Sequence, residues 1–373
     1  MEDKEMRLKV SRNIEELVPY PPGKPIEELE RELGISGSVK MASNENPVGP
    51  SPKALKAVTE ALSGINRYPD GGSFYLREKL SARLGLPMEQ IITGNGSNEI
   101  IELLIRTFLA SGEETVMGEP SFAVYPLVTK AAGGVPVMVP LKDMRLDLEA
   151  MREAVNEMTR IVFIANPNNP TGTAVKSSEL RRFIHSMPED VIICLDEAYR
   201  EYVTTSEYEE STGYLESGRA VIILRTFSKI YGLSGLRAGY GIGPAKMIDY
   251  LNRVRQPFNM NSLAQAAALA AIDDREHVER SRSVNAEGLK YLYGELDKMG
   301  LPYVPTEANF FLINVGEGAA VYRGLLKKGV IVRPMASYGL GSYIRLTVGL
   351  PEENARFISS LTEVLNDLAR KRA

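Results

Sequence analysis

Cysteine and histidine are scarce in this chain, and both shortages limit the chemistry open to it. Among 373 residues there are one cysteine, Cys194, and two histidines, His185 and His277. One cysteine excludes an internal disulfide, and the apolar residues 191–195 around it predict a buried structural thiol. Three cysteine and histidine residues are too few for a typical zinc site, and we therefore predict no metal site. The histidines lie in helix-like or charged sequence, so the mechanism must use lysine, aspartate, tyrosine and arginine.

Long apolar runs and an excess of positive charge are also missing. No run of about 18 apolar residues is present, and the N-terminal sequence MEDK has no apolar core, so neither membrane spanning nor secretion is indicated. A net charge of −4 argues against a general nucleic-acid binder. We expect a cytoplasmic protein with small-molecule partners, long enough to form two domains.

Short apolar runs alternate with helical patterns through the middle of the chain. Near-continuous hydrophobicity in these runs is typical of strands that are buried on both faces. The predicted strands are 90–93, 115–117, 135–139, 160–164, 191–196, 220–225 and 240–243. Together these patterns predict an α/β fold with a mostly parallel sheet covered by helices.

Helices are predicted where a cap and a periodic apolar face coincide. Ser51 followed by Pro52 is typical of a helix start, and apolar residues recur along one face of residues 99–108 and 357–368. Four prolines between residues 19 and 25 predict an extended N-terminal arm. We expect the arm to join the C-terminal part in a smaller α+β domain.

The domain prediction divides the chain into three stretches. Residues 1–40 form the N-terminal arm, residues 41–262 a large domain with the mostly parallel sheet, and residues 263–373 a small C-terminal domain. No repeat or low-complexity segment marks a boundary.

Residues 226–241 contain the most informative group of side chains. Lys229 offers an amine that can form a Schiff base with a carbonyl, while Thr226, Ser228 and Arg237 offer two hydroxyls and a guanidinium to a phosphate. The pattern indicates a site that holds a phosphorylated aldehyde. Taken alone, it is equally compatible with a solvated lysine in a glycine-rich loop.

Three further segments follow predicted strands and carry polar groups. Residues 94–98 form a glycine-rich turn before a helix, which favours an anion, although such a segment is often only a turn. Asp196 ends a buried strand, where a carboxylate needs a positive partner or a capping role. Asn169 lies in the turn-rich residues 166–172 and could donate to a phenolic oxygen, but turn formation alone would also explain that composition.

Together these motifs, in this order, resemble the fold-type-I pyridoxal-phosphate aminotransferases over nearly the whole chain. The motifs that carry the resemblance are Ser228-Lys229 with Arg237, residues 169–172, residues 196–199 and residues 94–99. A second group resembles the histidinol-phosphate aminotransferase branch of that superfamily. Its motifs are residues 19–23, 44–47, 67–70, 257–261 and 329–334.

The resemblance implies pyridoxal 5'-phosphate as the cofactor, joined covalently to Lys229. It also implies that Asp196 pairs with the pyridinium nitrogen, so that the ring can accept electrons, and that Lys229 then carries a proton during transamination. The implied catalytic residues are Lys229, Asp196 and Tyr199. The other implied cofactor-binding residues are Asn169, with Tyr199, at the ring 3-oxygen, Phe122 on the ring face, and Ser97, Asn98, Thr226, Ser228 and Arg237 at the phosphate, with Tyr68 reaching it from the other subunit of a homodimer.

The resemblance also implies a substrate side with two arginines. Arg333 and Arg345 are expected to bind a substrate phosphate, although two arginines fit a carboxylate equally well, and Tyr20 and Asn261 are expected to line the same side. The implied reaction is ping-pong transfer of an amino group between histidinol phosphate and 2-oxoglutarate, in histidine biosynthesis. The alternatives are an aromatic aminotransferase, a pyridoxal-phosphate decarboxylase of a phosphorylated amino acid, and a silent ligand-binding module.

Overall fold

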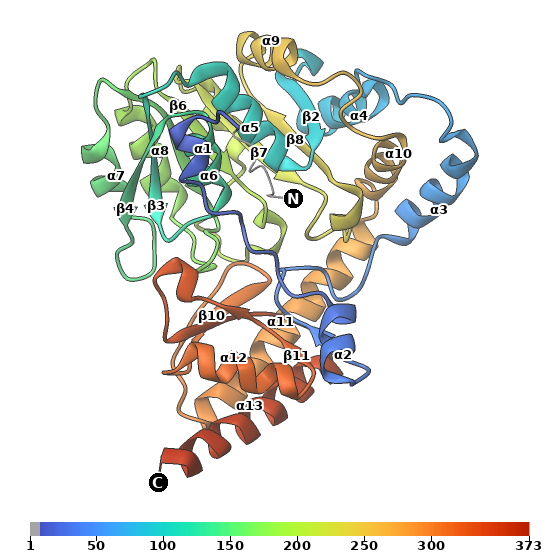
Figure 1. Ribbon diagram of the computed structural model, residues 1–373. Helices are drawn as coiled ribbons and strands as arrows, with labels where there is room; N and C mark the ends of the chain where they lie inside the picture. The colour runs from blue at the N-terminus through green and yellow to red at the C-terminus, as the bar shows by residue number, and fades with distance from the viewer. Residues whose placement is uncertain (1–7, 373) are drawn as a thin grey trace, which may run out of the picture.

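The structure, a computed structural model that describes residues 8–372, has two bodies that lie one above the other in Figure 1. The upper body contains a seven-stranded sheet with helices on both faces. The lower body contains a smaller four-stranded sheet and the C-terminal helices. A single long helix, α11 (Arg275–Lys298), runs from one body into the other.

The large sheet has the strand order β2-β8-β7-β6-β5-β3-β4 and is parallel except for β8. All seven predicted strands are present, and their ends lie within two residues of the predicted ones. The strands are β2 (Ile91–Asn95), β3 (Glu114–Glu119), β4 (Val135–Pro140), β5 (Thr159–Ala165), β6 (Ile192–Asp196), β7 (Val221–Thr226) and β8 (Ala238–Ile242). The prediction of a mostly parallel sheet in an α/β fold is therefore confirmed.

Helices bury both faces of this sheet, which explains why its strands read as continuous apolar runs. One face packs against α3 (Pro52–Ala61), α4 (Phe74–Leu84), α7 (Leu148–Ala154), α8 (Ser177–Ser186) and α10 (Ser262–Ala271). The opposite face packs against α5 (Ser97–Phe108), α6 (Val124–Ala131) and α9 (Ala245–Val254). Successive strand residues point to opposite faces, so Cys194 lies on the α6 side and Leu195 on the other. Cys194 is fully buried, as predicted.

The lower body is built on an antiparallel sheet of order β12-β13-β10-β9. Its strands are β9 (Tyr303–Val304), β10 (Phe310–Asn314), β12 (Arg333–Pro334) and β13 (Tyr343–Thr347), and its helices are α12 (Gly318–Lys327) and α13 (Pro351–Arg372). The predicted amphipathic C-terminal helix corresponds to α13, which buries Phe357, Leu361 and Val364.

The N-terminal arm contacts both bodies. It contains two short helices that were not predicted, α1 (Arg12–Glu15) and α2 (Ile26–Leu33), joined by an extended proline-rich stretch. The arm ends in β1 (Val39–Lys40), which pairs with β11 (Val330–Ile331) of the lower body. At its other end the Asn13 amide donates to the carbonyls of Lys130 and Ala131 at the end of α6. The pairing of β1 with β11 joins the end of the arm to the lower body, and the Asn13 contact joins its start to the upper body.

The boundary predicted near residue 262 stays a prediction, and the hydrophobic core favours a later one. Apolar residues of α10, through Ile272, belong to the same cluster as the large sheet. The turn after α10 is tied to the start of α3, because the Ser51 hydroxyl donates to Asp274 at 2.6 Å while accepting from the Ala54 amide. Ser51 is thus the helix cap that the sequence predicted.

Two classes of feature are absent from residues 8–372. No helix there is both long and apolar enough to cross a lipid bilayer. Histidine, cysteine and carboxylate side chains form no group of three or more that could hold a metal ion within the same residues.

A buried ion pair joins the carboxyl-terminal ends of β6 and β7, two central strands of the large sheet. Arg225 of β7 is 1% exposed, and its Nε donates to Glu197, 2% exposed, at 2.9 Å. The same guanidinium donates to Glu210 and to the Ser211 hydroxyl, and the Tyr208 hydroxyl donates to Glu197. Every charge in this network has a partner, which is the condition under which buried charges are tolerated.

Replacing Arg225 by leucine should lower the free energy of unfolding by up to about 3–5 kcal/mol, because the buried Glu197 carboxylate would lose its closest guanidinium. It would keep Arg200, 3.3 Å away, and the Tyr208 hydroxyl. Urea unfolding of the purified protein measures this change. As a control, Arg181→Leu removes an arginine that pairs with Glu209 at the surface, and it should leave the urea midpoint unchanged. Equal effects of the two variants would contradict the assigned role of the buried pair.

Candidate active site

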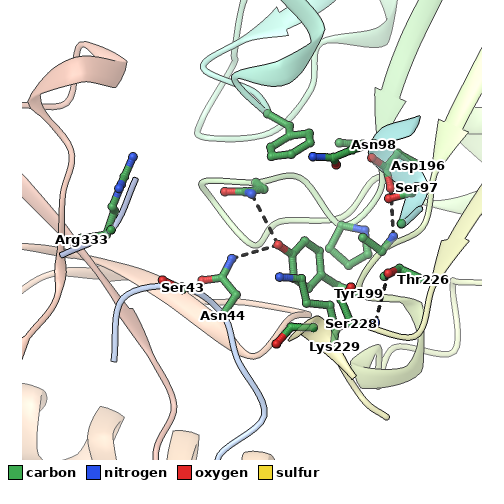
Figure 2. A pocket seen from close by; sticks show the side chains of 18 of the residues that line it. Ser43, Asn44, Ser97, Asn98, Asp196, Tyr199, Thr226, Ser228, Lys229 and Arg333 are labelled. Atoms are coloured by element: carbon green, nitrogen blue, oxygen red, sulfur yellow. Dashed lines mark hydrogen bonds between the residues drawn. The ribbon is translucent and has the colours of Figure 1, made fainter. Parts of the chain in front are cut away.

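A cavity of about 200 Å³ opens where the carboxyl ends of β5, β6 and β7 meet the start of α5 (Figure 2). This is the edge of a parallel sheet at which ligands usually bind. Most of the residues predicted as site residues line it. They are Tyr20, Ser97, Asn98, Phe122, Asn169, Asp196, Tyr199, Thr226, Ser228, Lys229, Arg237, Arg333 and Arg345.

Lys229 lies three residues beyond the end of β7, and its amine faces this cavity. The Nζ atom is 5.6 Å from the centre of the Tyr199 ring. Burial lowers the pKa of Lys229 to about 8, and the positive charges of Arg345 and Arg237 act in the same direction against Glu45 and Asp196. A substantial fraction of the amine is therefore neutral, and able to attack a carbonyl, near pH 8.

Asp196 is the last residue of β6 and is only 5% exposed. The strand alternation that places Cys194 on the α6 side also places the Asp196 carboxylate there. It accepts a hydrogen bond from the Tyr125 hydroxyl at 2.7 Å and another from the Ala198 amide at 3.1 Å. Burial raises the pKa of Asp196 to about 6, while these two donors and Lys229 act to lower it. The carboxyl group is therefore mostly ionised at neutral pH.

The Tyr199 hydroxyl lies between two amide side chains (Figure 2). It accepts from Asn44 Nδ2 at 2.9 Å and from Asn169 Nδ2 at 3.4 Å. Burial raises the pKa of Tyr199 to about 12, so the phenol stays protonated and keeps a hydrogen to donate. Asn44 is a cavity residue that was not predicted, although it lies in the motif of residues 44–47. Its contact with Tyr199 spans 155 residues of chain, so no local pattern reveals it.

The start of α5 and the loop after β7 together form an anion cradle. Gly96, with φ 76°, precedes the first residue of α5, where backbone N–H groups are free. A Cβ atom on Gly96 would lie 2.8 Å from Arg237 Nη2, and one on Gly239 would lie 2.6 Å from the Ser97 amide nitrogen. Glycine is therefore required at both positions for the guanidinium and the helix end to approach each other. The predicted hydroxyls, Thr226 and Ser228, line the same cavity.

Arg345 brings a buried positive charge into the cavity from the lower body. It is 6% exposed, and it donates to Asn169 Oδ1 at 2.6 Å and to the Ala42 carbonyl at 2.8 Å. Its Nε atom is buried and has no hydrogen-bond partner within residues 8–372. A buried donor of this kind costs free energy unless a ligand accepts from it. Arg345 is therefore suited to an anionic group of a ligand.

Arg333 stands on the opposite side of the cavity from Asp196 (Figure 2). Its guanidinium lies 5.3 Å from the centre of the Tyr20 ring and donates to the Pro21 carbonyl at 2.9 Å. The N-terminal arm thus holds the second arginine in place. The structure brings Tyr20, Arg333 and Arg345 together at this cavity, and their role toward a substrate stays a prediction.

Two predicted site residues lie outside this cavity. Tyr68 is 82% exposed and stacks on Phe258, with ring centres 4.8 Å apart. Asn261 caps α10 instead, because its Oδ1 accepts from the Ala264 amide at 2.8 Å. The expectation that Asn261 lines the substrate side is thus not met within this chain, since a capping amide is already engaged with the backbone.

The arrangement meets the separate needs of a cofactor that carries an aldehyde, a phosphate and a basic ring nitrogen. An amine faces the cavity, a buried carboxylate is held by two donors, and a helix start with an arginine can take the phosphate. These groups come from different strands of one α/β sheet and converge only in the folded chain. The fold and the cavity therefore define a pyridoxal-phosphate-dependent enzyme of fold type I.

Comparison with known proteins gives the family. The family model described as aminotransferase class I and II matches residues 36–361. The histidinol-phosphate aminotransferase of Moorella thermoacetica is 50% identical over 349 residues, which are 93% of this chain and 90% of that protein. Histidinol-phosphate aminotransferase 1 of Nitrosococcus oceani is also 50% identical, over 95% of this chain and 96% of that protein.

A solved structure agrees with the sequence relatives. The histidinol-phosphate aminotransferase of Sinorhizobium meliloti, in complex with pyridoxal-5'-phosphate, superposes with a TM-score of 0.88 at 27% identity, over 98% of this chain and 99% of that one. The chain therefore belongs to the class I and II aminotransferases, and within them to the family of the histidinol-phosphate aminotransferases.

The amine of Lys229 should titrate near pH 8 in the protein freed of cofactor, because burial and the neighbouring arginines disfavour its charged form. Competitive acetylation across a pH series, followed by peptide mapping, measures this midpoint. The Arg345→Met variant should move the midpoint upward, since it removes a positive charge that lowers the pKa of Lys229. A midpoint near 10.4, the ordinary value for lysine, would show that the amine is not perturbed.

Proposed function

We propose that this protein transfers an amino group between histidinol phosphate and 2-oxoglutarate, with pyridoxal 5'-phosphate as its cofactor. The observation that carries the proposal is the pair Arg345 and Arg333 on the substrate side of a cavity that also holds Lys229 and Asp196. Relatives 50% identical over nearly the whole chain bear the name of this activity. The activity would serve histidine biosynthesis.

Different residues around the cavity would bind different parts of the cofactor. Lys229 would hold the aldehyde, and Asp196 would stabilise the protonated ring nitrogen, because a buried anion favours a cation beside it. Asn169 and Tyr199 would donate to the ring oxygen, and Phe122 would cover one ring face. Bound in this way, pyridoxal phosphate supplies an electron sink for the carbon that loses its proton.

The phosphate of the cofactor would lie at the start of α5. Free backbone N–H groups and the positive helix end favour an anion there. The side chains that would hold it are Ser97, Asn98, Thr226, Ser228 and Arg237.

Lys229 is also placed to move the proton of the reaction. A lysine with a pKa of about 8 exchanges between its neutral and charged forms near neutral pH, as a general base and acid must. Its Nζ lies over the Tyr199 ring, and both residues line the cavity. The same amine would serve both half-reactions.

The substrate would be recognised through its phosphate. Arg345 offers a buried donor, Nε, without a partner among the described residues, and Arg333 offers a second guanidinium beside the Tyr20 ring. Guanidinium groups match the geometry of phosphate oxygens. An aromatic 2-oxo acid would instead use one arginine for its carboxylate, which keeps an aromatic aminotransferase as the second candidate.

Incubating the purified protein with L-glutamate and imidazole acetol phosphate should produce histidinol phosphate and 2-oxoglutarate in equal amounts. Chromatography of both products measures the reaction. Turnover confined to aromatic oxo acids would move the assignment to an aromatic aminotransferase. Release of one carbon dioxide per turnover would move it to a decarboxylase.

The Arg333→Met variant tests whether Arg333 binds the substrate phosphate, with L-glutamate as the comparison substrate. Loss of a charged hydrogen bond should raise the KM for the phosphorylated substrate about ten- to a hundredfold. The KM for L-glutamate should change much less if Arg333 meets only the phosphate. A uniform rise for both substrates would show a general disturbance of the cavity.

We further propose that the active protein is a homodimer with shared sites. Tyr68 and Phe258 form an exposed aromatic pair, and apolar side chains nearby along the chain, Leu62, Ile65, Phe74 and Tyr75, are also exposed. Exposed apolar groups of this size are typical of protein–protein interfaces. Tyr68 would then reach the cofactor phosphate of the partner subunit.

Mixing two impaired variants tests the shared site. Lys229→Ala lacks the amine and Tyr68→Phe lacks the phenol, so dissociation and reassociation should form hybrid dimers with one intact site. The mixture should therefore be more active than either variant alone. Mixed activity no higher than the sum of the parents, or an active monomer in gel filtration, would contradict the proposal.

A further inference from the structure

Tyr125 of α6 is a buried tyrosine beside the cavity to which the proposed chemistry gives no role. Its side chain is 0% exposed, and it was not predicted as a site residue. Its hydroxyl donates to Asp196 Oδ2 at 2.7 Å. That oxygen belongs to the carboxylate proposed to face the cofactor ring nitrogen.

Packing holds the Tyr125 ring on both sides. It stacks on Phe163 of β5, with ring centres 4.5 Å apart and planes 7° apart. On another side it meets Phe122 edge to face, with centres 5.5 Å apart and planes 86° apart. Both are favourable aromatic geometries, so the hydroxyl is fixed in position against Asp196.

Tyr125 therefore contacts two of the groups proposed to hold the cofactor ring. Its hydroxyl meets the carboxylate for the ring nitrogen, and its ring edge meets Phe122, the side chain for the ring face. We infer that Tyr125 is a positioning residue that orients the Asp196 carboxylate and the Phe122 ring for the pyridine ring of the cofactor. This inference rests on the proposed cofactor role of Asp196.

The Asp196 carboxylate needs a second hydrogen-bond donor if both of its oxygens are to be held in place. An ionised carboxylate has two acceptor oxygens, and the Ala198 amide engages only Oδ1. The Tyr125 hydroxyl engages Oδ2, so the plane of the carboxylate is set by two donors from different elements. With the Ala198 amide as its one donor, the carboxylate would be held less firmly against rotation about its Cβ–Cγ bond.

Other charged or titratable groups near Asp196 act on its charge or are acted on by it. The positive charge of Lys229, after β7, lowers the pKa of Asp196, whereas the charge of Glu197, the next residue, raises it from the opposite face of the sheet. Cys194 on β6 and Tyr199 also lie close enough to feel the Asp196 charge. Burial is the largest influence and raises the pKa of Asp196, whereas the hydrogen bond from Tyr125 is the largest opposing one. The Tyr125 phenol itself stays protonated, because burial and the Asp196 charge both raise its pKa.

The Tyr125→Phe variant tests the inference, since it keeps the ring contacts and removes only the hydroxyl. In cofactor-free protein with carbon-13-labelled aspartate, the Asp196 carboxyl should titrate above its present pKa of about 6. The Asp196→Asn variant identifies its signal. In the loaded protein, kcat should fall about ten- to a hundredfold, as expected for loss of a hydrogen bond to a charge, while the KM for L-glutamate changes little.

Tyr202→Phe is the matched control. Tyr202 is also buried, and its hydroxyl has no hydrogen-bond partner in the part of the chain that the structure describes. Removing that hydroxyl should leave the Asp196 titration and kcat unchanged. Equal changes in both variants would mean that any buried phenol has this effect, and the inference would be overturned.

A double-mutant cycle separates a positioning role from a structural one. If Tyr125 acts through Asp196, the Tyr125→Phe change should lower kcat further by less than about twofold in an Asp196→Ala background. A full additional loss there, or an unshifted Asp196 titration in Tyr125→Phe, would overturn the inference. The titration uses neither cofactor nor substrate, so it is unaffected if the proposed reaction proves wrong.

Discussion

A buried carboxylate at the end of a parallel strand is the constraint on which the site depends. Asp196 costs free energy where it lies, because desolvation disfavours its charge. Two hydrogen bonds and a nearby lysine amine offset part of that cost. What remains favours a cation in the cavity, and the protonated ring nitrogen of the cofactor would provide one. The surrounding helices have to exclude water while supplying donors, and α6 does both.

Several residues of the site follow neighbouring strands at one edge of the large sheet. Because β5, β6 and β7 run parallel, their carboxyl ends deliver Asn169, Asp196 and Lys229 to the same cavity. Glu197, the residue after Asp196, points to the opposite face of the sheet, where it pairs with Arg225. Two adjacent carboxylates thus have separate roles, one in the cavity and one in the framework that keeps the strand ends in register.

The two arginines proposed to bind the substrate come from more distant parts of the chain. Arg345 and Arg333 come from paired strands of the lower body, and both reach groups near the N-terminus, the carbonyls of Ala42 and Pro21. The arm therefore connects the small sheet to the mouth of the cavity. A movement of the lower body would shift both guanidinium groups together, whereas the cofactor side stays fixed to the large sheet.

The sequence by itself determined the strands, the mostly parallel sheet and the identity of most cavity residues. Apolar runs and glycine-rich turns are short stretches of consecutive residues, and the motifs around Lys229 can be recognised by their order along the chain. Only the tertiary structure decided which side chains touch. Tyr125 belongs to none of the sequence motifs, Asn44 meets Tyr199 across 155 residues, and Asn261 caps a helix within this chain. These outcomes depend on how strands and helices pack, because contacts between residues far apart in the chain leave no periodic signal in it.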